Sequence, residues 1–381
     1  CCDIIIIMMF KKGGIMKKIK KIFLSALPII IGVGIGFLGS YFGIYKAFEV
    51  LFDNIFYNIV FLVLSLAVSV LIAILFHELG HLIAGLLSGY GFLSYRVGSF
   101  ILVKYSTGYE LKRYSIPGTA GQCLMTPPKY NNGNFPFILY NSGGWIMNLV
   151  LGGIGILIYT LSENPFLRYF LFIFIAIQIL AALSNAIPLS MGVPNDGKNI
   201  QILKNNLEAR EGFWSMLQVN ALLTEGMEYK DIPEKYLKDP KELTILTIYY
   251  PLYRAMALLQ RGEYEQAYEL QKELMKHPEA LTINEIILRY DLLTTKILLS
   301  DDQENLKTEI DPYLTKEFYK MDKIFKSFLN RNRFWILYYK YVEIDPKKEE
   351  EYQKNFNKIC ETNPNKGEVV SERKILEKTM N

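Results

Sequence analysis

The sequence lacks the cysteine pairs that hold structural zinc or build a disulfide framework. Its 4 cysteines are isolated from any C-x-x-C spacing in a chain of 381 residues. They therefore predict neither a thiolate metal site nor a disulfide scaffold. An excess of one charge is lacking too: the formal net charge is +4, with acidic and basic residues mixed along the chain. This balance gives no indication of nucleic-acid binding.

Charge is also missing from long stretches of the first half. Residues 55–76 read IFYNIVFLVLSLAVSVLIAILF, without one charged side chain. As a helix this run measures roughly 33 Å, enough to cross the apolar core of a bilayer. Apolar runs of similar length cover residues 22–45, 136–161 and 166–189, the last of which contains one charged residue, Arg168. We therefore expect about four membrane spans in contact with the lipid bilayer.

The first residues are unusual for the start of a protein. Residues 1–15 precede Met16, and Lys-Lys-Gly-Gly just before it can be encoded by a bacterial ribosome-binding sequence. We expect translation to begin at Met16, with residues 1–15 a mis-assigned upstream extension; a genuine extension is the alternative. The apolar run at 22–45 is longer than that of a signal peptide and lacks a small-x-small cleavage site, which favours a retained span.

The distribution of lysine and arginine predicts the topology. Lys17, Lys18, Lys20 and Lys21 precede the first span and favour a cytoplasmic N-terminus. Counting spans then makes residues 91–134 cytoplasmic, and that segment is rich in basic residues. The expected product is a multi-pass protein of the cell membrane whose C-terminal half is cytoplasmic. Abundant Lys, Ile, Asn and Tyr fit an AT-rich bacterial genome.

Two segments outside the spans have recognisable patterns. Residues 91–131 alternate apolar and polar side chains around a Ser-Thr-Gly turn, which predicts a β-hairpin. In the polar second half, similar segments begin at Ala221, Ala257 and Ile297. Such a period predicts stacked helical hairpins, and the middle copy matches the GxYxxA…P pattern of tetratricopeptide repeats.

The expected fold is therefore mainly α. A polytopic membrane part with about four helices and a small β-hairpin precedes a soluble α-helical repeat domain. Composition changes near residue 200. The expected parts are a first span with its outer loop at 16–54, a core with the following spans at 55–200 and a cytoplasmic repeat domain at 201–381.

The uncharged run at 55–76 continues into FHELGH, which places ionisable groups at a costly position. His77 and His81 are four residues apart, so they share one helical face with Cβ atoms about 6 Å apart, suited to one metal ion. Glu78 has the position of a general base. Two imidazoles, one carboxylate and an open position indicate Zn²⁺. The remaining histidine, His277, is expected on the surface.

A third ligand must come from elsewhere in the chain. Asp196 lies in NDG, after an apolar helix interrupted by Pro188 and Pro194, where irregular backbone can line a cavity. The alternative is that NDG is only a turn at the membrane exit. The residues themselves leave both interpretations open.

Four elements in order resemble the site-2 protease family of intramembrane zinc metalloproteases. They are HELGH in a membrane helix, a following β-hairpin, a GxxxN helix at Gly144 and Asn148, and an NxxP…DG segment running from Asn185 to Gly197. Trp145 stands where the family has proline, and SMGV adds residues before PNDG. The resemblance covers about residues 57–200. It implies that residues 55–200 are a metalloprotease core, with the hairpin as a membrane-associated element beside the active site. It also implies that Asp196 is the third zinc ligand and that Asn185 assists near the reacting carbonyl; Gly144 and Asn148 equally suit helix packing.

The predicted function is zinc-dependent hydrolysis of a peptide bond in or beside the membrane. The resemblance implies membrane proteins or peptides as substrates, such as regulatory proteins or signal-peptide remnants. The alternative is a membrane-anchored protein whose repeat domain binds a cytoplasmic protein or peptide partner, with a secondary or vestigial metal site. A soluble secreted metalloprotease fits less well, because the motif continues an uncharged span.

Overall fold

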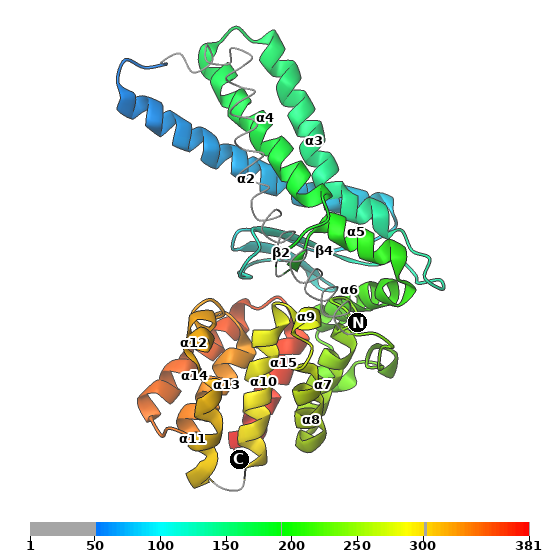
Figure 1. Ribbon diagram of the computed structural model, residues 1–381, viewed down its shortest axis with the longest axis vertical. Coiled ribbons are helices and arrows are strands. Elements are labelled where there is room, and N and C mark those ends of the chain that lie inside the picture. The colour runs from blue at the N-terminus through cyan, green and yellow to red at the C-terminus, as the bar shows by residue number, and fades with distance from the viewer. Residues whose placement is uncertain (1–50, 192, 301–302, 381) are drawn as a thin grey trace, which may run out of the picture. The chain divides into compact units, whose positions relative to one another are not determined.

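The computed structural model describes residues 51–191, 193–300 and 303–380 (Figure 1). The expected span at 22–45 and the expected start at Met16 lie outside the described residues. Two compact units make up the described chain. The first contains residues 51–80 with Asn141–Asn199, and the second contains His81–Tyr140 with Ile200–Asn381.

Among the described residues, three helices are long and apolar enough to cross a membrane: α2 (Ile55–Leu87), α3 (Phe137–Leu161) and α4 (Pro165–Ala186). Much of their surface consists of exposed Leu, Ile, Val and Phe side chains, which are stable in contact with lipid. The chain is thus membrane-associated. The predicted spans at 55–76, 136–161 and 166–189 are found as helices, while the total of four stays a prediction.

Helices α3 and α4 form an antiparallel hairpin with a short connection (Figure 1). Asn164 caps α4 by accepting a hydrogen bond from the Leu167 amide, and Pro165 occupies the first turn. Gly155 lets the helices approach, since a Cβ there would lie 2.9 Å from Ile175 Cγ1. Helix α4 ends at Ala186, earlier than predicted, because Pro188 forces the preceding residue into an extended conformation.

The segment after α4 leads into a polar helix. Two short strands, β5 (Ser190–Met191) and β6 (Val193–Pro194), pair with each other. They contain most of SMGV, the residues that this chain has in addition to the family pattern. Helix α5 (Asp196–Asn205) follows. The break between α4 and α5 places Asp196 in the first turn of a new helix, rather than in an isolated turn.

The predicted β-hairpin is part of a larger sheet in the second unit. Strands β1 (Gly91–Val97), β2 (Phe100–Tyr105), β3 (Gly108–Arg113) and β4 (Gly121–Thr126) form an antiparallel sheet in the order β3-β2-β1-β4. The β2–β3 turn falls where Ser-Thr-Gly predicted it. The predicted hairpin is only part of the observed sheet, because β4 pairs with β1, which is distant in the sequence. Local alternation of side chains does not reveal this pairing.

The two faces of the sheet differ. In β2, Ile101, Val103 and Tyr105 are buried. Phe100 and Leu102 on the opposite face are 54% and 38% exposed, and Tyr109 and Leu111 of β3 continue this outer apolar face. Monomeric soluble proteins rarely expose such a surface without a role.

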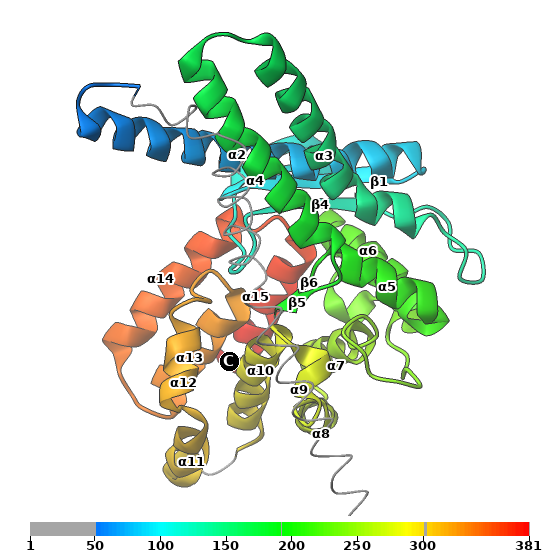
Figure 2. The ribbon, with the colours of Figure 1, turned by 45° about the horizontal axis from the view of Figure 1, so that its top comes forward.

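The rest of the second unit is helical. Its elements are α6 (Leu207–Glu225), 3₁₀ helices at Tyr229–Asp231 and Glu234–Tyr236, α7 (Tyr249–Arg261), α8 (Tyr264–Leu274), α9 (Pro278–Leu281), α10 (Asn284–Leu299), α11 (Gln303–Ile310), a 3₁₀ helix at Asp311–Tyr313, α12 (Lys316–Asp322), α13 (Leu329–Tyr341), α14 (Pro346–Thr362) and α15 (Lys366–Met380). Figure 2 shows α14 alongside α13, and these helices are in contact.

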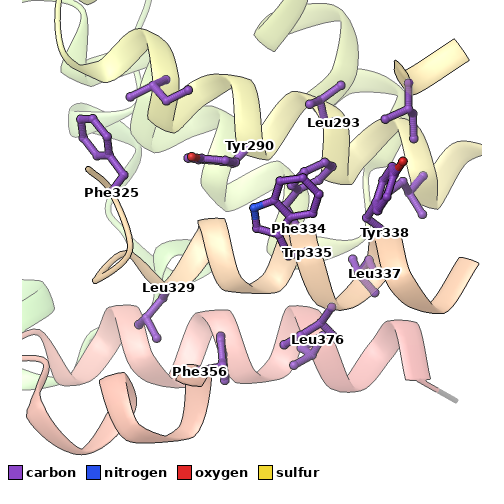
Figure 3. Close-up of a cluster of buried hydrophobic side chains, with 14 of the residues drawn as sticks. Tyr290, Leu293, Phe325, Leu329, Phe334, Trp335, Leu337, Tyr338, Phe356 and Leu376 are labelled. Carbon is purple, nitrogen blue, oxygen red and sulfur yellow. The ribbon is translucent and has the colours of Figure 1, made fainter. Parts of the chain in front are cut away.

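An aromatic core holds the last helices together. Phe334, Trp335 and Tyr338 of α13 face Tyr290 and Leu293 of α10 (Figure 3). On the other side of α13, side chains of α14 and α15 complete the same cluster. The almost complete burial of α13 between these helices makes it the centre of the helical part.

A regular repeat of helical hairpins is not confirmed. The middle copy does form a hairpin: Gly262 ends α7 with φ +90°, and Ala267 is fully buried where α8 meets its neighbours. The copy beginning at Ala221 has its first helix and the turn glycine, Gly226. It lacks the second helix, because the following segment contains Pro233 and Pro240 and forms only 3₁₀ turns.

The sheet shares a core with the helices that follow residue 200. Tyr105 Oη donates a hydrogen bond to the Pro364 carbonyl at 2.8 Å, and Trp214 Nε1 donates to the Pro128 carbonyl at 2.7 Å. Met125 of β4 lies in one hydrophobic cluster with Phe213 of α6. The sheet therefore belongs to the same compact unit as these helices, although composition groups it with the segment before residue 200.

Candidate metal centre

Helix α2 carries the HELGH motif without interruption. His77 and His81 lie one turn apart on one face, and Glu78 follows His77. Gly80 lies against α3, where a Cβ would overlap the Gly143 carbonyl oxygen and come within 2.7 Å of Met147 Cβ. Only glycine permits this close approach, so the motif is held firmly against its neighbouring helix.

Asp196 is positioned by the residue before it. Asn195 Oδ1 accepts hydrogen bonds from the Lys198 amide at 2.9 Å, capping α5, and from the Leu189 amide at 3.0 Å. Its Nδ2 donates to the Ile187 carbonyl at 2.7 Å. Asn195 thereby ties the start of α5 to the end of α4. Sequence reasoning missed this residue, although an Asn ahead of a helical segment is a known capping signal.

The ligand atoms are close enough for one ion. His77 Nε2 lies 3.3 Å from Asp196 Oδ2, and both residues belong to the first unit. The possible ligand atoms of His77, His81 and Asp196 all lie within 4.8 Å of one another. A tetrahedral zinc ion with bonds of about 2.0–2.1 Å separates its ligand atoms by about 3.3 Å. The donor set therefore suits a metal ion such as zinc, and the separation of the His77 and Asp196 atoms matches the spacing expected for zinc.

Both imidazoles are held in the form that binds metal through Nε2. His81 Nδ1 lies 2.8 Å from the Tyr140 carbonyl oxygen, which can only accept a hydrogen bond. His77 Nδ1 lies 2.8 Å from Asn148 Oδ1. The orientation of that amide is fixed because its Nδ2 donates to the carbonyl of Ala73 at 3.1 Å. With Nδ1–H donating in both rings, each Nε2 offers its lone pair to a metal.

A buried amide pair supports His77. Asn148 and Gln178 are both fully buried, and Asn148 Nδ2 donates to Gln178 Oε1 at 2.8 Å. Of the two interpretations given for Asn148, the structure supports helix packing combined with orientation of a candidate ligand. Gln178 was missed at the sequence level. The sequence feature that could have identified Gln178 is an amide side chain inside the apolar run FLFIFIAIQILAAL, where a polar group needs a hydrogen-bonding partner.

The site is partly accessible. Glu78 and His81 are each 8% exposed, whereas the side chains of His77 and Asp196 retain 13% and 17% of their accessible surface. Low exposure strengthens electrostatic interactions at the carboxylates and imidazoles. The remaining exposure allows water to reach the candidate ligands. Both conditions suit metal-assisted hydrolysis.

Two other polar residues, Asn185 and Glu110, form contacts outside the candidate ligand group. Asn185 Nδ2 donates to the Ala181 carbonyl of its own helix at 2.9 Å, so its predicted role near the reacting carbonyl stays a prediction. Glu110, a carboxylate in the segment between HELGH and Asp196, pairs with Lys112 at 3.4 Å and Lys366 at 3.5 Å on the sheet. Glu110 is not in the candidate ligand group.

Gly197 provides a test of how Asp196 is positioned. A Cβ at this residue would overlap the Ala186 carbonyl oxygen, so Gly197→Ala should push the start of α5 away from the end of α4. Overpacking of this kind costs about 1–3 kcal/mol, so we expect zinc affinity to fall roughly tenfold or more without loss of any ligand. Competition with a chelating dye measures the affinity.

The matched control is Gly153→Ala in α3, where a Cβ would have no heavy atom within 4 Å. This variant should bind zinc like the unmodified chain. Equal zinc affinity in the Gly197→Ala and Gly153→Ala proteins would show that the close approach at Gly197 does not position Asp196.

Comparison of the chain with protein-family models, with curated proteins and with solved structures found no match.

Proposed function

We propose that the protein is an intramembrane zinc metalloendopeptidase of the site-2 protease type. The observation that carries the proposal is the grouping of His77, His81 and Asp196 at ligand distance, with Glu78 beside them on an apolar helix. Ionisable side chains in such a helix are costly and are usually functional. The four sequence elements that resemble the site-2 protease family support the same proposal.

The side chains of the site have different roles in the proposed reaction. A zinc ion, when bound, would supply Lewis acidity that favours ionisation of water and polarises a carbonyl group. Glu78 takes a proton from the attacking water at its carboxylate and delivers it to the nitrogen of the leaving amine. Asn148 and the Tyr140 carbonyl orient His77 and His81 through Nδ1. The outcome is hydrolysis of one peptide bond.

The substrate is proposed to be a membrane protein or a membrane-bound peptide. A helical substrate hides its carbonyl groups, so it must become extended before cleavage. Strand β3 lies at the edge of its sheet, and the outer apolar face with Phe100, Leu102 and Leu111 is exposed. These features support capture of an extended segment by strand addition.

The proposed location is the cell membrane of a bacterium, in a multi-pass arrangement with the N-terminus and C-terminal half in the cytoplasm. Lysines at 17, 18, 20 and 21 and the basic segment 91–134 support this orientation. A second candidate function, binding of a cytoplasmic partner by the helical part, is favoured by the cavity described in the next subsection. It is compatible with proteolysis.

Removal of the metal tests the proposal. Protein purified in non-ionic detergent should contain about one zinc per chain by elemental analysis, because the site has one set of three ligands. It should cleave at least one of a set of synthetic single-span peptides. Treatment with 1,10-phenanthroline should abolish cleavage, and added Zn²⁺ should restore it.

The control is 1,7-phenanthroline, an isomer that cannot chelate, which should leave cleavage unchanged. Zinc-free protein that cleaves the peptides, or zinc-loaded protein that cleaves none of them while retaining its helical content, would contradict the proposal.

A further inference from the structure

The second unit contains a cavity of about 180 Å³ that the proposed proteolysis does not use. Its wall includes four tyrosines from separate elements: Tyr114, which follows β3, Tyr229 of a 3₁₀ helix, and Tyr249 and Tyr253 of α7. All four are only partly buried, although Ile248 and Tyr250 beside Tyr249 are almost completely buried. Tyrosine surface therefore remains accessible next to the buried core.

Three carboxylates complete the lining: Asp291 of α10 and Glu368 and Glu372 of α15. Asp291 and Glu372 are 5% and 2% exposed. No lysine, arginine or histidine lines the cavity in the described part of the chain. The lining is thus anionic and aromatic together.

A single guanidinium group forms ion pairs with two of these carboxylates. Arg333 contacts Asp291 and Glu372, each at 2.5 Å, and is fully buried. Glu368 accepts a hydrogen bond from Asn365 at 3.4 Å and forms no ion pair among the described residues. If all three carboxyls were ionised, three negative charges would face one positive charge. Buried charges are normally paired, so this imbalance favours either protonation of the carboxyls or binding of a cation.

The pKa values of the three carboxyls are raised in a way that a bound cation would reverse. Burial raises the pKa of Glu368, and it raises the pKa of Glu372 to about 8 despite the nearby Arg333. Burial also raises the pKa of Asp291. Each carboxyl is therefore held less ionised than in water, and a positive charge placed among them would reverse this effect.

We propose that this cavity binds an organic ammonium cation, seated against the tyrosine rings and paired with Glu368. Aromatic faces attract ammonium groups through the quadrupole of the ring, and this attraction is strongest when the cation is desolvated. A carboxylate without an ionic partner provides the opposing charge. Tyr249 and Tyr253 lie on α7, whereas the acids lie on α10 and α15, so the bound cation would link these three helices.

The size of the cavity limits the ligand. A cavity of about 150 Å³ accommodates a benzene-sized molecule, so about 180 Å³ suits an alkylammonium group of a few carbons. A lysine side chain of a peptide and a free small amine share this chemistry. A nucleotide is too large, and an anion would be repelled by the acidic side chains. The site is independent of the proposed peptidase.

Calorimetric titration of the full chain in non-ionic detergent tests the proposal. The probes are n-butylammonium, tetramethylammonium and a short peptide with one lysine, with n-butanol and butyrate as the neutral and anionic counterparts. The ammonium ions should bind at least about tenfold more tightly than either counterpart, because only they gain the charge and ring interactions. Tighter binding of the peptide than of n-butylammonium would identify a lysine side chain as the source.

Variants localise the binding. Glu368→Gln and Tyr253→Leu should each weaken ammonium binding about tenfold or more, while Tyr253→Phe, which keeps the ring, should bind like the unmodified chain. Glu377→Gln is the matched control, because Glu377 is an exposed residue on the same helix that does not line the cavity. Circular dichroism confirms the fold of each variant. Equal binding of n-butanol, no ammonium binding, or unchanged affinity in folded Glu368→Gln protein would overturn the proposal.

Discussion

Replacing Asp196 by Ala should remove zinc from the purified protein and abolish peptidase activity. Two histidines alone hold zinc weakly, and catalytic zinc sites use three protein ligands. Asp196 Oδ2 lies 3.3 Å from His77 Nε2, which is the separation expected of two atoms bound to one ion. Elemental analysis of the purified variant, beside a cleavage assay with single-span peptides, measures both effects.

A role for Asp196 in stability alone predicts a smaller effect. Asp196 is in the first turn of α5, where a carboxylate contributes about 0.3–1 kcal/mol through the helix dipole. Losing that contribution does not unfold a protein of this size. An ion pair between Asp196 and a protonated His77 would require no metal at all. Zinc content separates these explanations, because only ligation predicts the loss of zinc in a folded variant.

Two further variants sharpen the test of Asp196. Asp196→Asn keeps the shape of the side chain but removes its charge, and it should also lose zinc. Glu110→Ala should retain zinc, since Glu110 pairs with Lys112 and Lys366 on the sheet. Stoichiometric zinc in folded Asp196→Ala protein would place the third ligand elsewhere.

Local patterns in the sequence predicted the parts of the fold that depend on local physics. Long apolar runs predicted α2, α3 and α4, because lipid requires an apolar surface over a fixed length. The spacing of His77 and His81 predicted a shared face because one turn separates them. The proximity of Asp196 depended on the folding of distant segments. The residues left it open, and only the resemblance to a family favoured it.

Features set by tertiary structure could not be predicted in this way. The pairing of β1 with β4 joins strands separated by the intervening hairpin. Arg96 is one of the basic residues of segment 91–134 that favour a cytoplasmic location, yet its guanidinium is fully buried and donates to the Gly98 carbonyl at 2.7 Å. The orienting contacts of Asn148 and Asn195 likewise depend on partners that only the folded chain supplies.

Replacing Glu78 by Gln should leave zinc in place and lower the rate of peptide cleavage by about 10²–10⁴-fold, the usual contribution of a general acid–base group. Glutamine has nearly the same size as glutamate, so the 8% exposed site should keep its packing. The amide cannot accept and return the proton that hydrolysis requires. Zinc content, helical content and cleavage rate measured on one preparation would show the separation between binding and chemistry.

Glu163→Gln is the matched control for Glu78→Gln. Glu163 is exposed in the connection between α3 and α4, so the same chemical change there should alter neither zinc content nor rate. Full activity in the Glu78→Gln variant would rule out Glu78 as the proton-transferring residue.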